Sequence, residues 1–258
     1  MTTSGQGDRW FIRPLPEGDD PLLFCFPYTG MGASSYRDWP AKLGNFVVVP
    51  LQPPGRESRF RETAHATHAE FAADLVSAMR PHVLGRDCAF AAHCGAVPYA
   101  LEAVWAMSAA VLKPPARLIA SSWGAPHRGL YGRLNRVDLD SLDAVGEVRA
   151  IAAQFGRPLP DDLAELVADV LHEDLRIQRG YRYGATRPLP CPVTVISWSD
   201  DDVVPSHQVH SGWEECAAVR HRTLTGTHRD YLRCPPVLRD LIALDLSNGP
   251  VPGEEATR

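Results

Sequence analysis

Cys94 lies in a stretch of sequence that could present a nucleophile to a substrate. It follows the apolar run Cys88–Ala92, and a run of helix-forming residues follows it, so we expect a strand, a tight turn and a helix. The positions two before and two after it, Ala92 and Ala96, are small, as a sharp turn requires. A buried free cysteine often serves only as a small apolar side chain. The strand, turn and helix context instead favours a nucleophile elbow and predicts covalent catalysis by Cys94.

Two later segments could supply the partners of this nucleophile. Three consecutive aspartates follow the apolar run Val193–Trp198, and Asp201 has a Val-Pro pair at the offset expected for the acid of a triad. Asp200 and Asp202 stay open as alternatives. His228 lies on a glycine-led loop after the last apolar run. The chain order nucleophile, acid, histidine is typical of α/β-hydrolases, and it predicts His228 as the base and Asp201 as the acid that orients it.

A glycine-rich loop, Phe26–Ala33, directly follows the first strong apolar run. Such a loop can direct a backbone N–H at the negative charge that develops on a substrate oxygen. We expect the amides of Thr29 and of Gly95, the residue after the nucleophile, to form this oxyanion hole. A glycine turn that serves only the fold is the alternative.

Apolar runs and helical patterns alternate along the chain and must position these residues. Strands are expected at Leu22–Phe26, Phe46–Leu51, Cys88–Ala92, Ala116–Ser121, Val193–Trp198 and Val219–Leu224. Most are nearly continuous apolar runs, as expected of parallel strands covered on both faces. Helical patterns lie between them, for example His68–Leu84 and Pro98–Leu112. The alternation predicts an α/β-hydrolase fold with a mostly parallel, doubly wound sheet.

One segment, from about Asp138 to Tyr183, interrupts this alternation. It contains two helical stretches and no strand. The first, Ser141 to Phe155, is closed by Gly156, and the second opens at Pro160 and ends near Gly180. Such a pair could form a lid over the active site, or it could simply cover the sheet.

Length and composition indicate one soluble globular domain, which we place at residues 9–247 with flexible ends at 1–8 and 248–258. The net charge of −5 and the mixed signs give no reason to expect a nucleic acid partner. The six cysteines lack the spacing of a metal site, and we expect neither a metal ion nor a cofactor. The N-terminus lacks the features of a signal peptide, and the apolar stretch 97–112 is too short to span a membrane. A cytoplasmic location is therefore expected.

Several motifs resemble those of the stand-alone type II thioesterases of non-ribosomal peptide and polyketide synthases. The family elbow Gly-His-Ser-Met-Gly matches residues 92–96, with Cys94 in place of the serine. The most specific match is the family signature Gln-Leu-Pro-Gly-Arg-Glu, which is similar to residues 52–57. The family also has Phe-Pro-His-Ala-Gly-Gly where this chain has residues 26–31, so that Tyr28 replaces a histidine. Its Ser-Gly…Ala-Pro segment resembles residues 121–126, and its Gly-Gly-His-Phe resembles residues 226–229.

The resemblance implies a thioesterase that acts on acyl or aminoacyl groups held on the phosphopantetheine arm of acyl or peptidyl carrier proteins. It also implies a helical lid at about 138–183. The cysteine makes transfer of the acyl group to another thiol, amine or hydroxyl a close alternative, because an acyl group on Cys94 is still a thioester. A carrier-protein-binding module without catalysis is a third hypothesis, and it is the weakest because the acid and histidine positions are occupied.

Overall fold

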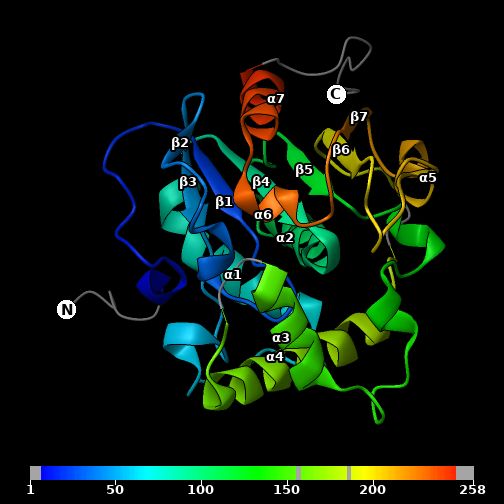
Figure 1. Cartoon of the computed structure of the whole chain (residues 1–258). Helices are drawn as coiled ribbons and strands as arrows, with labels where there is room; N and C mark the ends of the chain where they lie inside the picture. Colours follow the sequence, from blue (N-terminus) through cyan, green and yellow to red (C-terminus); the bar gives the residue numbers. More distant parts are fainter. Residues whose placement is uncertain (1–6, 155–157, 185–186, 248–258) are drawn as a thin grey trace.

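A seven-stranded sheet forms the centre of the protein in the computed structural model, which describes residues 7–154, 158–184 and 187–247 (Figure 1). The strand order is β2-β3-β1-β4-β5-β6-β7, and all neighbours are parallel except β2 and β3. The strands are β1 (Leu22–Cys25), β2 (Lys42–Leu43), β3 (Phe46–Pro50), β4 (Cys88–His93), β5 (Leu118–Ser121), β6 (Val193–Trp198) and β7 (Val219–Leu224). The predicted α/β-hydrolase type of fold is confirmed.

The central strands β1, β4, β5 and β6 are buried along their whole length, which explains their continuous apolar sequences. Strand β2 is not among the predicted strands, because two residues carry no readable periodicity. The parallel register brings the carboxyl ends of β4, β5 and β6 to one edge of the sheet. In this register His93 lies beside Ser121. In α/β sheets, this edge is where ligands bind.

Three helices pack on the sheet: α1 (His68–Val83), α2 (Val97–Ala109) and α7 (Pro236–Ser247). Figure 1 shows α1 and α2 on one side of the sheet and α7 on the other. Helix α1 is capped at its start, because the Thr67 hydroxyl accepts from the Glu70 amide and the Glu70 carboxylate accepts from the amide of Ala66, the residue before the N-cap. Helix α7 is anchored by the buried Asp245, which accepts a hydrogen bond from Thr194 in β6.

Two further helices, α3 (Ala144–Gln154) and α4 (Asp161–Gly180), lie side by side between β5 and β6 in the chain (Figure 1). They share an apolar cluster of their own, centred on Val148, Ala168, Leu171 and Leu175. Helix α4 begins and ends where the sequence pattern predicts, whereas the residue expected to close the first helix, Gly156, lies outside the described residues. We call α3 and α4 the lid helices.

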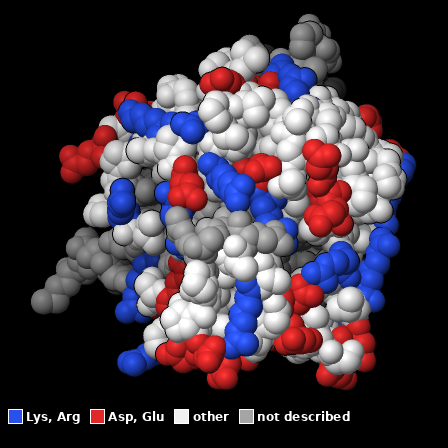
Figure 2. Space-filling model, in the orientation of Figure 1, with Lys and Arg blue, Asp and Glu red and all other residues white. Residues whose placement is uncertain are grey.

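The two expected flexible ends lie largely outside the described residues, although residues 7 and 8 belong to a short 3-10 helix, Gly7–Trp10. Two four-residue helices, α5 (Ser206–Val209) and α6 (Asp230–Arg233), follow β6 and β7. No helix within the described ranges is long and apolar enough to cross a membrane. Figure 2 shows basic and acidic side chains interspersed on the face in view.

Candidate active site

Cys94 occupies the tip of a strained turn at the carboxyl end of β4. Its φ angle is +53°, a left-handed conformation that a residue with a side chain adopts at a cost of about 1–3 kcal/mol. The 3-10 turn Cys94–Ala96 leads directly into α2, whose second residue is Pro98. Ala92 and Ala96 are buried, so larger side chains at these positions would have no space. The local structure is that of a nucleophile elbow.

His228 and Asp201 lie together, although 27 residues separate them in the chain. The Nδ1 atom of His228 is 3.1 Å from Oδ1 of Asp201 and 3.0 Å from Oδ2. The backbone amides of Val203 and Val204 donate to Oδ1, so the aspartate is held in place by its own turn. Of the three consecutive aspartates, Asp201 is the one whose carboxylate hydrogen-bonds to His228.

Ser122, which sequence reasoning did not single out, also fixes Asp201. Its hydroxyl donates to Oδ2 of the carboxylate at 2.6 Å. Its φ angle is +51°, at a position where the similar motif has glycine. The substitution keeps the left-handed backbone of a glycine site and adds a hydrogen-bond donor.

The electrostatic environment holds a proton on His228. Burial lowers the pKa of this imidazole, but the negative charge of Cys94 and the hydrogen bond to Asp201 outweigh it and raise the pKa to about 9. Burial raises the pKa of Asp201, but the hydrogen bond and charge of His228 lower it to about 2. A thiolate beside an imidazolium is the reactive form of a catalytic cysteine.

We expect the imidazole of His228 to titrate near pH 9 in the wild-type protein and at a lower pH in Cys94→Ala, because the variant lacks the negative charge of Cys94. The bound proton stabilises the folded chain below about pH 6.5, and this contribution is lost as the pH rises through the folded pKa. NMR titration of the histidine ring protons measures both midpoints. Equal midpoints in the two proteins would show that Cys94 does not act on His228.

A second residue beside the imidazole is Tyr28, whose hydroxyl lies 3.3 Å from Nε2 of His228. Burial raises the pKa of Tyr28, so the phenol is neutral and its oxygen can accept a hydrogen bond from the Nε2–H of the imidazolium. His93 packs between the rings of Tyr231 and His228, with centroid distances of 4.4 and 4.3 Å. Burial also lowers the pKa of His93 well below its usual value, so a neutral ring faces the imidazolium. Of these two adjacent histidines, His228 is therefore the charged one.

The expected oxyanion donors lie on neighbouring loops. In the turn after β1, the amides of Tyr28, Gly30 and Met31 all donate to protein acceptors, whereas within the described residues no acceptor is found for the amide of Thr29. A Cβ at Gly95 would clash with Nε2 of Gln178 and Oγ1 of Thr29, so a side chain there would displace both groups. The unpaired amide of Thr29 is therefore available to a substrate oxygen.

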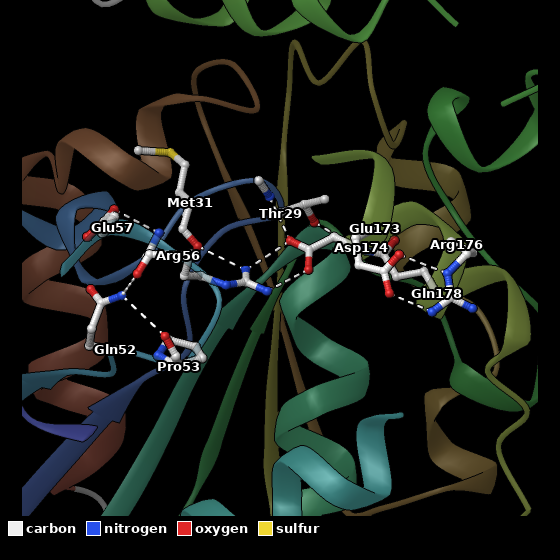
Figure 3. Close-up of polar contacts among 12 residues, drawn as sticks. Thr29, Met31, Gln52, Pro53, Arg56, Glu57, Glu173, Asp174, Arg176 and Gln178 are labelled. Atoms are coloured by element: carbon white, nitrogen blue, oxygen red, sulfur yellow. Dashed lines mark hydrogen bonds and ion pairs between the residues drawn. The ribbon is translucent and has the colours of Figure 1, made fainter. Parts of the chain in front are cut away.

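The segment Gln52–Glu57 packs against this loop (Figure 3). Glu57 accepts from the amides of Gly32 and Ser34, and Gln52 accepts from the amide of Ala33. The side-chain nitrogen of Gln52, Nε2, donates to the carbonyl of Arg56. The residues of the most specific sequence signature therefore brace the loop that carries the Thr29 amide.

A cleft of about 260 Å³ lies between this loop and the lid helices. Thr29 and Gly30 are among its lining residues, and about half of the lining is aliphatic: Val148, Ile151, Ala152, Leu159, Leu163, Leu166, Val167, Val170, Leu171 and Leu232. Within the described part of the chain, no group of three or more His, Cys, Asp or Glu side chains is placed to hold a metal ion.

Comparisons with known proteins agree with this fold. Residues 21–243 match the family described as thioesterase domain. The protein named linear gramicidin dehydrogenase LgrE, of Brevibacillus parabrevis, is 27% identical over 226 residues, which cover 85% of this chain and 86% of that protein.

Solved structures of thioesterases are similar over almost the whole chain. The RedJ thioesterase from the prodiginine biosynthetic pathway of Streptomyces coelicolor is 29% identical, with a TM-score of 0.72 and coverage of 93% of this chain and 92% of that one. The type II thioesterase BorB from the borrelidin biosynthetic cluster is 24% identical, with a TM-score of 0.75 and coverage of 92% and 96%. The likeness to BorB concerns the fold alone.

The fold and the neighbours define an enzyme of the α/β-hydrolase superfamily. More specifically, the chain belongs to the thioesterase domain family, whose match spans all of the strands and both lid helices. The enzyme is a thioester hydrolase.

Proposed function

We propose that this enzyme is a type II thioesterase that hydrolyses acyl or aminoacyl thioesters on the phosphopantetheine arm of carrier proteins, in the cytoplasm, through an acyl group bound to Cys94. The observation that carries the proposal is the position of Cys94 at φ +53° on the elbow, beside a histidine that the same cysteine and Asp201 keep protonated. Relatives associated with gramicidin and prodiginine support a role in a non-ribosomal peptide or polyketide pathway.

The first half of the reaction loads the enzyme. The Cys94 thiolate attacks the carbonyl carbon of the thioester, and the amides of Thr29 and Gly95 donate to the oxygen as it becomes negative. The bond between the carbonyl carbon and the pantetheine sulfur then breaks. His228 gives its proton to the departing sulfur, which leaves as a thiol.

The second half releases the acid. His228, now neutral, takes a proton from water as the oxygen attacks the acyl carbon. The bond to Sγ of Cys94 breaks, and the thiolate and imidazolium are restored beside each other. Asp201 keeps its carboxylate throughout and orients the ring through Nδ1, 3.0 Å away. One thioester and one water become one acid and one thiol.

Acyl transfer is the second candidate, and the cysteine itself favours it. Loading a serine from a thioester runs downhill, whereas loading Cys94 exchanges one thioester for another and is readily reversible. Such an acyl-enzyme can give its group to a second thiol, to an amine or to a hydroxyl. Cysteine acyl-enzymes also hydrolyse well, so the family activity keeps hydrolysis first.

Cys94→Ser is expected to separate the two reactions. One acyl-loaded carrier protein and one empty carrier protein are mixed with wild type or variant, and the masses of both carriers and the free acid are followed. We expect wild type to release free acid with some exchange between carriers. The serine variant should still release acid, whereas exchange should collapse, because return from an oxyester to a thiol runs uphill. If wild type instead loads the second carrier protein and releases almost no free acid, acyl transfer replaces hydrolysis as the proposed activity.

A binding module without catalysis is the third candidate. All six cysteines are buried, and Cys94 lies beside the protonated His228, a neighbour that increases the reactivity of a thiol. Rapid alkylation of Cys94 ahead of the other five thiols would therefore contradict this candidate. Peptide mapping after brief treatment with iodoacetamide distinguishes the six sites.

A further inference from the structure

Helix α4 of the lid places two polar side chains, Asp174 and Gln178, against the candidate oxyanion hole (Figure 3). They are four residues apart, so they lie on the same face of the helix. Both are buried, at 2% exposure each. Polar side chains that are this deeply buried require specific partners, and those partners identify what the residues do.

Asp174 joins the lid to two segments of the site. Its Oδ2 atom accepts from the amide of Gly30 at 2.8 Å, and Gly30 directly follows Thr29 in the chain. The guanidinium of Arg56 donates to both carboxylate oxygens, at 2.9 and 2.7 Å, and also to the carbonyl of Met31 at 3.1 Å. A bidentate pair has a defined geometry, so Asp174 fixes the Thr29–Gly30 peptide directly and, through Arg56, the carbonyl of Met31.

Gln178 contacts the same loop one turn further along the helix. Its Nε2 atom donates to Oγ1 of Thr29 at 3.0 Å. Its Oε1 atom accepts from Nδ2 of Asn135 at 3.1 Å, so the amide group has a defined orientation. The side chain also lies directly above Gly95, where it occupies the space of the missing Cβ. Gln178 therefore contacts both residues whose amides form the candidate hole.

We propose that Asp174 and Gln178 are positioning residues of the oxyanion hole, so that lid helix α4 must be in place for the Thr29 amide to receive the developing charge. This inference rests on the proposed function and extends it, because it assigns the lid a part in catalysis besides covering the substrate. Misplacement of a reacting group by about 1 Å can slow a reaction by up to 100-fold. Displacement of the Thr29 amide should therefore lower the rate of chemistry more than it weakens substrate binding.

The test compares two reactions of Cys94 in the variants Asp174→Asn and Gln178→Met. One is acylation by a thioester in a single turnover, which passes through an oxyanion. The other is alkylation by iodoacetamide, a displacement at a saturated carbon that forms no oxyanion. The matched control is Glu173→Gln, which removes a carboxylate from the same helix where it pairs with the exposed Arg176. Methionine at position 178 keeps the length of the side chain and removes both hydrogen-bonding groups.

We expect acylation to fall roughly 10- to 100-fold in both variants, with alkylation within about twofold of the control. The fall should lie mainly in the maximal rate of acylation and less in the substrate concentration that gives half of it. Acylation equal to that of the control, or an equal loss of both reactions, would overturn the inference. If Asp174→Asn does not fold because Arg56 loses its partner, Gln178→Met decides alone. Failure of wild type to be acylated at all would instead reject the proposed function.

Discussion

Cys94→Ala is expected to lower thioester hydrolysis by at least about 10⁴-fold, because it removes the atom that carries the acyl group. The fold should survive. The substitution deletes one sulfur from a turn already flanked by Ala92 and Ala96, and it keeps the same backbone strain at φ +53°. We expect the free energy of unfolding to change by no more than about 1 kcal/mol. Release of thiol from an acyl-loaded carrier protein measures the activity, and denaturant unfolding measures the stability.

A useful control is Cys191→Ala, which removes another buried thiol far from the elbow in the chain. This control should retain hydrolysis. Hydrolysis by Cys94→Ala at the rate of this control would rule out Cys94 as the nucleophile, provided that both variants unfold at similar denaturant concentrations.

The second large effect is expected for His228→Ala, at roughly 10²- to 10⁴-fold, the usual contribution of general acid and base catalysis. Asp201→Ala should be less damaging. A thiolate and imidazolium pair forms more easily than an activated serine, so the cysteine depends on its base more than on the carboxylate that orients the base. Steady-state kinetics of thioester hydrolysis for the two variants gives the order of the effects.

Asp200→Ala and Asp202→Ala are the matched controls for Asp201→Ala. The Asp200 carboxylate accepts from the hydroxyl of Ser199, and Asp202 is exposed. Both should keep nearly all activity. A larger loss in either of them than in Asp201→Ala would move the acid to that residue.

The sequence was sufficient for most of the fold because parallel strands and lid helices each carry a strong local pattern. Strands β6 and β7 and helix α4 have the predicted bounds or nearly so, since continuous apolar runs and a 3.6-residue period are readable without tertiary information. The antiparallel pairing of β2 with β3 could not be read. A two-residue strand is determined by its neighbour in space and has no pattern of its own.

The candidate site was predictable where chain order and motif carry the information, as for Cys94, Asp201 and His228. The structure brings the histidine to both of its expected partners. Supporting residues could not be found in this way. Ser122 appears in the sequence as a mismatch to a glycine, and Gln178 lies on a helix that is 149 residues from Thr29, its contact in space. Long-range pairs of this kind leave no local signal.

The most direct measurement is the location of the acyl group after the first turnover. Wild-type enzyme is mixed with excess acyl-loaded carrier protein, quenched in acid within the first turnover, and examined by intact mass and by peptide mapping. The proposed mechanism predicts one acyl group per enzyme, on the peptide that contains Cys94, and its loss as free acid accumulates. Release of the carrier thiol with the acyl group on another residue, or on no residue of the enzyme, would contradict it.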